Sequence, residues 1–167
     1  MEQKISIRPS KMSDLGSLAV MLNSLVDEKA MIFVQKKVTA SKISIHFENA
    51  IKDKKMAYLV LSIDKEIMGR AKITVQSGPE RHIGELSIYV KKEARGKGLG
   101  ERLLREIIDK AVKKFDLKII TLTVYARNKI ARSLYKKIGF EKIGIFKKGI
   151  SHYGAYEDVI LMAKYID

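Results

Sequence analysis

The sequence contains no cysteine and no tryptophan, and only two of its 167 residues are proline. Without cysteine the chain can form no disulfide, no thiolate metal site and no cysteine nucleophile. Its three histidines, His46, His82 and His152, lack the spacing of a metal site. No apolar run approaches membrane-spanning length, and the first residues lack the apolar core of a secretion signal. We therefore expect a soluble, cytoplasmic protein that needs no metal and no membrane.

Acidic residues are scarce relative to basic ones. The chain has 33 Lys and Arg against 19 Asp and Glu, which gives a net charge of +14. This surplus favours anionic ligands such as phosphorylated cofactors or nucleic acid, but it says nothing about the fold. Low-complexity tracts, repeats and Pro/Gly-rich linkers are absent as well, so we expect residues 1–167 to form one domain.

Apolar periodicity predicts strands and helices in a mixed order. Strands are expected at 4–10, 56–63, 66–75, 83–90, 119–127, 140–146 and 155–163, and helices at 13–26, 39–51, about 100–115 and 129–139. This order predicts an α/β (α+β) fold with a mixed, mainly antiparallel central sheet of about seven strands and helices on both faces. In the last helix, Ile130, Ala131, Leu134, Tyr135 and Ile138 are expected to share the apolar side.

The segment RGKGLG, residues 95–100, joins a predicted strand to the longest predicted helix. Free backbone N–H groups at the start of a helix attract an anion, and glycines remove the side chains that would block its approach. Gly96, Gly98 and Gly100 therefore predict a pyrophosphate cradle, to which Arg95 can add charge-assisted contacts. The segment is no P-loop, and Glu101 stands where a dinucleotide fingerprint needs its third glycine. A solvated turn with a basic flank is the simpler alternative.

The stretch SIYVKKEARGKGLGERLL resembles the acyl-CoA-binding motif of the GNAT superfamily, the GCN5-related N-acetyltransferases. Arg95, Gly98 and Gly100 fill its pattern, [RQ]-x-x-G-x-[GA]. A second block, LTVYARNKIARSLYKKIGFEKIG, resembles the strand, helix and strand that follow in the family, including Asn128, Tyr135 and a Gly-Phe step. The segments 73–90 and 149–165 are most similar to members that acetylate amino acids and other small amines.

This resemblance implies a GNAT-like fold in which acetyl-CoA lies where strands 83–90 and 119–127 separate. The pantetheine arm would pair with the backbone near Ile88 to Val90, and the pyrophosphate would rest on the amides of 95–100. The cofactor contacts expected from the resemblance are Ile88, Tyr89, Val90, Arg95, Gly96, Lys97, Gly98, Leu99, Gly100, Asn128, Ala131 and Tyr135. Lys97, Arg102 and Arg132 are further candidates for the CoA phosphates.

By the same resemblance, the acceptor amine attacks the thioester directly from the opposite side. This reaction needs a base for the ammonium proton, a donor for the oxyanion and an acid for the leaving thiolate. Tyr135 fits the acid, the N–H of Val90 fits the donor, and Glu85 is the leading candidate for the base. A solvent-facing Glu85 paired with a lysine stays open, and so does a water relay with no dedicated base. So do a core role for Tyr135 and an N-cap role for Asn128.

Thr123 stands where members that acetylate ribosomal-protein N-termini often carry glutamate, which argues against a protein N-terminus as the acceptor. We therefore expect an acetyl-CoA-dependent N-acetyltransferase acting on a small primary amine such as an amino acid. The alternatives are the same reaction on a protein N-terminus or lysine, a silent CoA sensor, and a basic nucleic-acid module. No RRM-type or helix-turn-helix pattern supports the last, so no nucleic-acid partner is expected. Family members are often dimers, and a homodimer is left open.

Overall fold

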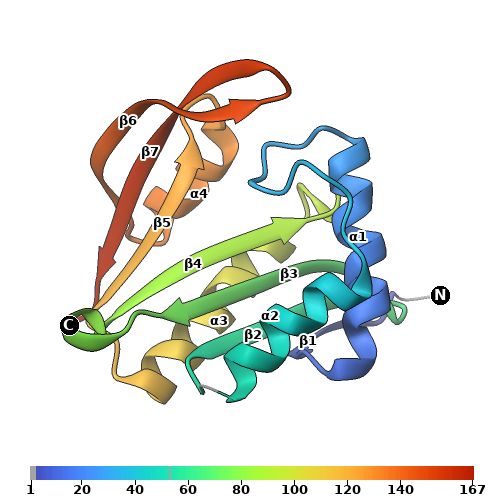
Figure 1. Ribbon diagram of the computed structural model, residues 1–167. Coiled ribbons are helices and arrows are strands. Elements are labelled where there is room, and N and C mark those ends of the chain that lie inside the picture. The colour runs from blue at the N-terminus through green and yellow to red at the C-terminus, as the bar shows by residue number, and fades with distance from the viewer. Residues whose placement is uncertain (1–2, 53) are drawn as a thin grey trace.

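A computed structural model of the chain describes residues 3–52 and 54–167 (Figure 1). The side chains of His46 and of residues 49–52 also lie outside the description. Within the described residues, seven strands form one sheet in the order β1-β2-β3-β4-β5-β7-β6. The strands are β1 (Ile5–Pro9), β2 (Met56–Ile63), β3 (Glu66–Val75), β4 (Ile83–Val90), β5 (Ile119–Tyr125), β6 (Glu141–His152) and β7 (Ala155–Tyr165).

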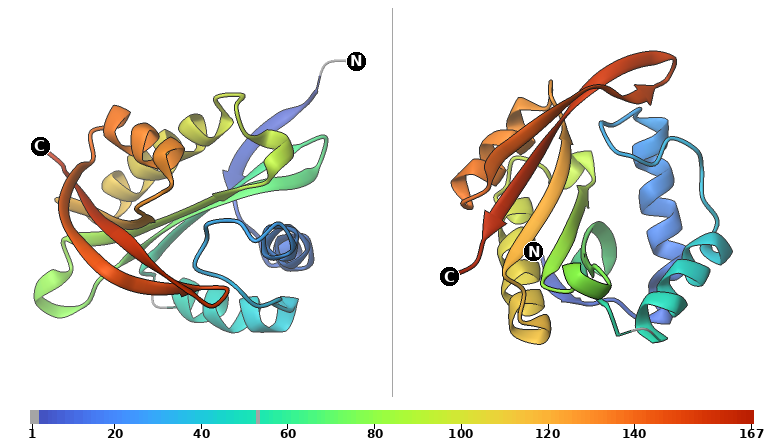
Figure 2. Two further views of the ribbon diagram at one scale, coloured as in Figure 1. Left: turned by 90° about the horizontal axis from the view of Figure 1, so that it is seen from above. Right: turned by 60° about the vertical axis from the view of Figure 1, so that its left-hand side comes forward.

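In the described residues, α-helices cover both faces of the sheet, α1 (Leu15–Asp27) and α2 (Ala40–Lys52) on one face and α3 (Leu99–Phe115) and α4 (Lys129–Lys137) on the other (Figure 2). All neighbouring strands pair antiparallel except β4 and β5, which are parallel. The predicted mixed, mainly antiparallel sheet of seven strands with helices on both faces is therefore confirmed. None of the helices in the described part combines the length and the apolar character that crossing a membrane requires.

The two faces of the sheet carry separate apolar clusters. On one face, Leu103, Leu104 and Ile107 of α3 are fully buried over the central strands. On the other, α1 packs Leu18 and Met21 against β2 and β3. Side chains of β4 therefore point alternately into the two clusters, so neighbouring residues of this strand lie on opposite faces of the sheet.

The tight connection between β2 and β3 forms where the sequence predicts it. Asp64 and Lys65 are its two central residues, and their φ angles of 49° and 73° are both positive. Two consecutive positive φ angles are typical of a type I′ turn, whose twist matches that of a two-residue hairpin. The hairpin fixes the register of β3, which carries several of the polar side chains discussed below.

Two expectations near the C-terminus are wrong in detail. Ile130 is 87% exposed, because the buried stripe of α4 runs through Ala131, Leu134, Tyr135 and Ile138 and leaves Ile130 at its edge. Strands β6 and β7 are also longer than predicted. The register of β6 shifts near Gly144 and before Ile150, and such irregularities interrupt the alternation from which strands are predicted.

Candidate active site

Strands β4 and β5 pair over three positions and then separate. The paired residues are Ile83 with Ile119, Gly84 with Ile120 and Glu85 with Thr121. Beyond them β4 follows β3 as far as Val90, while β5 follows β7 as far as Tyr125. Figure 1 shows the resulting divergence. The expected separation between these two strands is confirmed, and it leaves two backbone edges facing each other without a ladder.

The backbone of β4 presents alternate residues to this gap. The N–H of Lys91 donates to Met68 on β3 at 2.7 Å, and the carbonyl of Ile83 accepts from Gln76 at 3.0 Å. Because hydrogen-bonding direction alternates along a strand, Ile88 and Val90 direct their N–H groups away from β3 and into the gap. The backbone of Tyr89, which was expected to help bind the cofactor, is directed toward β3 instead.

The loop before α3 leaves a series of amides without partners. Among the described residues, the N–H groups of Gly96 to Glu101 donate to no protein acceptor, and the first helical bond is Arg102 to Gly98 at 3.1 Å. Gly96 and Gly98 both have φ of 72°, and a Cβ added at either would meet nothing within 4 Å. Glycine is therefore required here by backbone conformation and not by packing. Six consecutive free amides at a helix N-terminus form an anion site.

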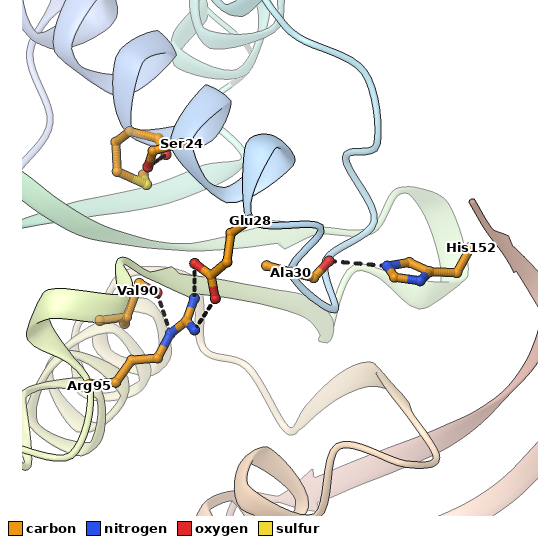
Figure 3. Close-up of polar contacts among 7 residues, drawn as sticks. Ser24, Glu28, Ala30, Val90, Arg95 and His152 are labelled. Atoms are coloured by element: carbon orange, nitrogen blue, oxygen red, sulfur yellow. Dashed lines mark hydrogen bonds and ion pairs between the residues drawn. The ribbon is translucent and has the colours of Figure 1, made fainter.

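Arg95 does not direct its guanidinium at this loop. Its Nε donates to the carbonyl of Val90 at 2.9 Å, and both terminal nitrogens bind the carboxylate of Glu28 at the end of α1 (Figure 3). Its own N–H is used by Lys92 at 3.1 Å. The side chain of Arg95 therefore holds the loop against β4 and α1, and the phosphate contacts expected of it stay a prediction.

Tyr135 lies on α4 beside the gap, in the same cluster as Ile88 and Val90. It is 8% exposed, and its ring lies 5.9 Å from that of Phe140. Its hydroxyl has no hydrogen-bond partner among the described residues, yet it is not sealed from solvent. Burial, with the nearby phenol of Tyr89, raises the pKa of Tyr135 above the usual value. The hydroxyl therefore stays protonated at neutral pH, as a proton donor must.

The other expected cofactor residues have mixed surroundings. Asn128 is the N-cap of α4, because its Oδ1 accepts from the N–H of Ala131 at 3.1 Å. Leu99 buries its side chain in the core, so only its backbone can meet a ligand, whereas Lys97 is exposed. Arg132 donates to the carbonyl of Ala126 at 2.7 Å and lines a basic hollow with Lys129, Ser133 and Lys136.

Glu85 occupies the last paired position of β4, where this strand begins to separate from β5. It is exposed, and no Lys or Arg nitrogen of the described residues lies within 4.0 Å of its carboxylate. Glu85, Ser87 and Tyr89 share the face of the sheet that α1 and α2 cover, opposite to Tyr135. Candidate acid and candidate base therefore lie on opposite faces, with the gap between them.

The connection between α1 and α2 forms a wall beside this second face. The turn between β6 and β7 holds it, because Tyr153 donates its hydroxyl to the carbonyl of Val26 at 3.1 Å and Gln35 donates to that of Ser151 at 2.5 Å. His152 contacts the carbonyl of Ala30 at 3.3 Å, which Figure 3 also shows. The wall therefore depends on contacts between residues 26–35 and residues 151–153, and the paired positions are 116 to 127 apart in the sequence.

The sequence profile described as the acetyltransferase (GNAT) family matches residues 21–140. The chain belongs to that family. An Escherichia coli L-amino acid N-acetyltransferase is 36% identical over 107 residues, which are 64% of this chain and 66% of that enzyme. A Pseudomonas aeruginosa L-methionine sulfoximine/L-methionine sulfone acetyltransferase is 24% identical over 97% of this chain and 95% of its own length.

Solved structures of this family have the same architecture. A GNAT-family acetyltransferase from Streptococcus pneumoniae superposes with a TM-score of 0.89 at 30% identity, covering 98% of this chain and 100% of its own. A ribosomal-protein-alanine N-acetyltransferase from Brucella melitensis gives 0.88 at 28% identity, covering 96% and 99%. A phosphinothricin acetyltransferase from Sinorhizobium meliloti also superposes, with a TM-score of 0.87 at 21% identity, covering 97% of this chain and 88% of its own. Proteins named for small molecules and for proteins thus share this fold, so the fold does not identify the acceptor.

Two features of this GNAT chain were missed from the sequence. Glu28 was not singled out, because its partner Arg95 lies 67 residues away. Arg70 and Lys72 were not singled out either, although they place two charges at alternate positions of β3, on the face of the sheet that α1 and α2 cover. A polar stripe facing a covering helix is a signal that sequence reasoning could have used.

Proposed function

We propose that the protein is an acetyl-CoA-dependent N-acetyltransferase for small primary amines, amino acids above all. One observation carries this proposal: six free amides at the start of α3 lie beside the edge of β4 that faces the gap and pairs with no strand there. A diphosphate suits the amides, and the amide-bearing arm of coenzyme A suits the strand edge. Belonging to the GNAT family supports this combination of ligand parts.

The proposed binding mode uses backbone more than side chains. Gly96 to Glu101 would hold the diphosphate, and Ile88 and Val90 would pair with the pantetheine arm. Lys97 and Arg132 have the charge to meet the remaining phosphate groups. This binding mode requires no metal ion.

The chemistry follows from the two faces of the gap. The amine would approach from the face with Glu85, lose its proton to that carboxylate or to a water relay, and attack the thioester carbon. The N–H of Val90 would donate to the carbonyl oxygen as negative charge develops there. Tyr135, on the opposite face, would give its proton to the leaving thiolate. Nitrogen gains the acetyl group and loses its second proton, the C–S bond breaks, and the thiol leaves with the proton from Tyr135. The second proton from nitrogen restores the phenol through solvent, and the base releases the first proton to water.

A small acceptor is favoured by the names of two relatives, an L-amino acid N-acetyltransferase and a methionine sulfoximine acetyltransferase. Thr123 supports the same choice, because it supplies no carboxylate on β5 facing the gap. Acetylation of a protein N-terminus is the second candidate, and the Brucella melitensis structure favours it.

The test is release of free thiol from acetyl-CoA in the presence of amino acids, polyamines, aminoglycosides or short peptides. Release that requires both acetyl-CoA and an amino acid is expected, with mass spectrometry showing the acetyl group on nitrogen. Peptides preferred by orders of magnitude would contradict the small-molecule acceptor. Calorimetry that finds no binding of coenzyme A to the folded protein would contradict the proposal as a whole.

We also propose that residues 1–167 form one domain and that the protein is a cytoplasmic homodimer. Exposed Ile143, Ile145 and Phe146 on edge strand β6 support self-association, since an apolar edge favours pairing. The cytoplasm is where acetyl-CoA is available. Sedimentation equilibrium tests the dimer, and cell fractionation tests the location.

A further inference from the structure

Arg70 on β3 is a buried cation without an acidic partner. It is 5% exposed, and no Asp or Glu oxygen of the described residues lies within 4.0 Å of its nitrogens. Its one hydrogen bond within this part of the chain runs from Nη1 to the carbonyl of Ser87, at 3.3 Å. A guanidinium carries five N–H groups, and a buried charge is costly unless it is paired. Arg70 therefore keeps several N–H groups without a protein acceptor in a buried position, where such donors are normally hydrogen-bonded.

Two aromatic rings hold the guanidinium in place. Its central carbon lies 4.1 Å from the centre of the Tyr89 ring and 5.8 Å from that of Tyr58. Such contacts fix the group while leaving its N–H edge available. Its unpaired nitrogens are not sealed off, since Ser10 Oγ is the one fully buried, unpartnered side-chain atom in the described part. The guanidinium of Arg70 is thus held in place, and its N–H groups without a protein partner remain in contact with solvent.

Lys72 adds a second cation two residues further along the same face. Burial lowers the pKa of Lys72, and the charge of Arg70 lowers it further, while Glu85 acts in the opposite sense. Asp14, the buried carboxylate at the start of α1, is already bound by Arg8 at 2.8 Å through each oxygen. The two cations thus repel each other, and an incoming anion would relieve that repulsion.

The two cations lie beside the edge where the amine is expected. Arg70 pairs in register with Tyr89, and Lys72 pairs with Ser87, on the face that also carries Glu85. Adjacent strands lie about 4.8 Å apart. An α-amino acid has its carboxylate and its amine on one carbon, so its two charged groups can reach two neighbouring strands. A simple amine or a peptide N-terminus offers no carboxylate at that distance.

We propose that Arg70, assisted by Lys72, binds the carboxylate of the acceptor, so that the substrate is an amino acid with a free α-carboxylate. This inference rests on the proposed function and narrows it. A carboxylate bound by two N–H groups of one guanidinium is held in a fixed orientation, which presents the amine to β4. The site thereby selects against amides, esters and peptides that carry the same side chain.

The test compares one amino acid with its carboxamide. For the L-amino acid with the highest thiol-release rate, the wild-type protein is expected to prefer the acid by about 10- to 100-fold in kcat/KM, the usual effect of losing a charge-assisted hydrogen bond. The amide's amine is less basic and therefore more often unprotonated at neutral pH, so protonation does not explain that preference. Equal use of acid and amide would overturn the inference.

Arg70→Met supplies the matching variant, because methionine keeps an unbranched apolar stem between the two rings. It is expected to raise KM for the acid about 10- to 100-fold while leaving KM for acetyl-CoA and the slow reaction of the amide unchanged. Arg81→Met, at an exposed arginine in the β3–β4 loop, is the control and should change none of these values. Equal losses on acid and amide would mean that Arg70 only supports the fold.

Failure of the inference can be told apart from failure of the proposed function. If no amine is acetylated, the proposed function fails, and calorimetry of the acid and amide forms on CoA-saturated protein tests the carboxylate subsite directly. Binding of the acid alone, lost in Arg70→Met, would support it, and binding of neither form or of both alike would refute it. If Arg70→Met does not fold, Lys72→Met replaces it, with an expected weakening of about 3- to 10-fold for the acid only.

Discussion

Glu28 accepts hydrogen bonds from both terminal nitrogens of Arg95, and the same guanidinium donates through Nε to the carbonyl of Val90. One side chain therefore joins the end of α1, the end of β4 and the loop that begins α3. Because α1 leads into the wall of the acceptor face, this contact connects the two halves of the site. It also explains the position of an arginine that points away from the anion cradle.

The bond to Val90 should be the part of this contact that matters for the cofactor. Arg95→Gln keeps a donor for that carbonyl, so its affinity for acetyl-CoA is expected to stay within about 3-fold of wild type. Arg95→Leu removes both contacts and should weaken binding about 10-fold or more. Calorimetry on the two variants decides the matter, and equal losses would show that the ion pair with Glu28 is the important element.

Gly98 and Gly100 should respond differently to alanine. Gly98 has φ of 72°, so alanine there is expected to cost about 1–2 kcal/mol in unfolding free energy and to place a methyl group before the cradle. At Gly100 a Cβ would meet only Val90 Cγ2, at 3.8 Å, which is ordinary contact. Urea unfolding and acetyl-CoA binding should both be impaired in Gly98→Ala and nearly normal in Gly100→Ala. Matching effects would mean that backbone conformation is not the reason for the glycine.

Removing the hydroxyl of Tyr135 should affect turnover and not binding. Tyr135→Phe keeps the buried ring against Phe140, so the fold and the affinity for acetyl-CoA should be preserved. Loss of a general acid typically lowers kcat about 100-fold or more. Tyr165→Phe, at a tyrosine that is 56% exposed, is the control. An unchanged kcat in Tyr135→Phe would leave this residue with a packing role alone.

The role of Glu85 is best tested through pH. Glu85→Gln removes the proposed base while keeping size and polarity, so the pH–rate profile should change shape. If a water relay that does not involve Glu85 accepts the proton, the variant should show the wild-type pH–rate profile at a similar rate. Steady-state rates over a wide pH range, with acetyl-CoA saturating, distinguish the two.

Asp14 should stabilise the protein only while it is charged. Hydrogen bonds from Arg8 lower the pKa of Asp14, with a further contribution from the backbone of Lys11. A carboxylate with a lowered folded-state pKa contributes stability above its unfolded pKa and loses it as pH falls through the folded value. Asp14→Asn should therefore cost about 2 kcal/mol at neutral pH. Urea unfolding should show this difference shrinking toward acid pH, and a constant difference would contradict it.

Local chemistry explains which parts of this molecule could be predicted. The turn at Asp64 and Lys65, the helix start at Gly98 and the N-cap at Asn128 each depend on residues within a few positions of one another. The family resemblance supplied the separation of β4 from β5, which no short pattern encodes. The motif arginine could be located from the sequence, but its side-chain partner could not, because Glu28 follows α1 and lies 67 residues before Arg95.

Burial of charge was the harder part to foresee. Arg70 and Lys72 look like solvated strand positions in a chain with 33 basic residues. Their burial depends on the packing of α1 and α2 over that face of the sheet, and tertiary packing of this kind is not visible in the local sequence. Ile130 is the converse case, an apolar residue in a helical pattern that ends up in solvent.

The two sides of the gap differ in how they are built. The cradle, the strand edge and Tyr135 come from one continuous stretch of chain, whereas the opposing wall joins residues 116 to 127 positions apart. Substitutions at Gln35, Ser151 or Tyr153 can therefore reshape the space for the amine while the nucleotide-binding loop keeps its own residues. A scaffold divided in this way can acquire new acceptors during evolution while it keeps a single acetyl donor.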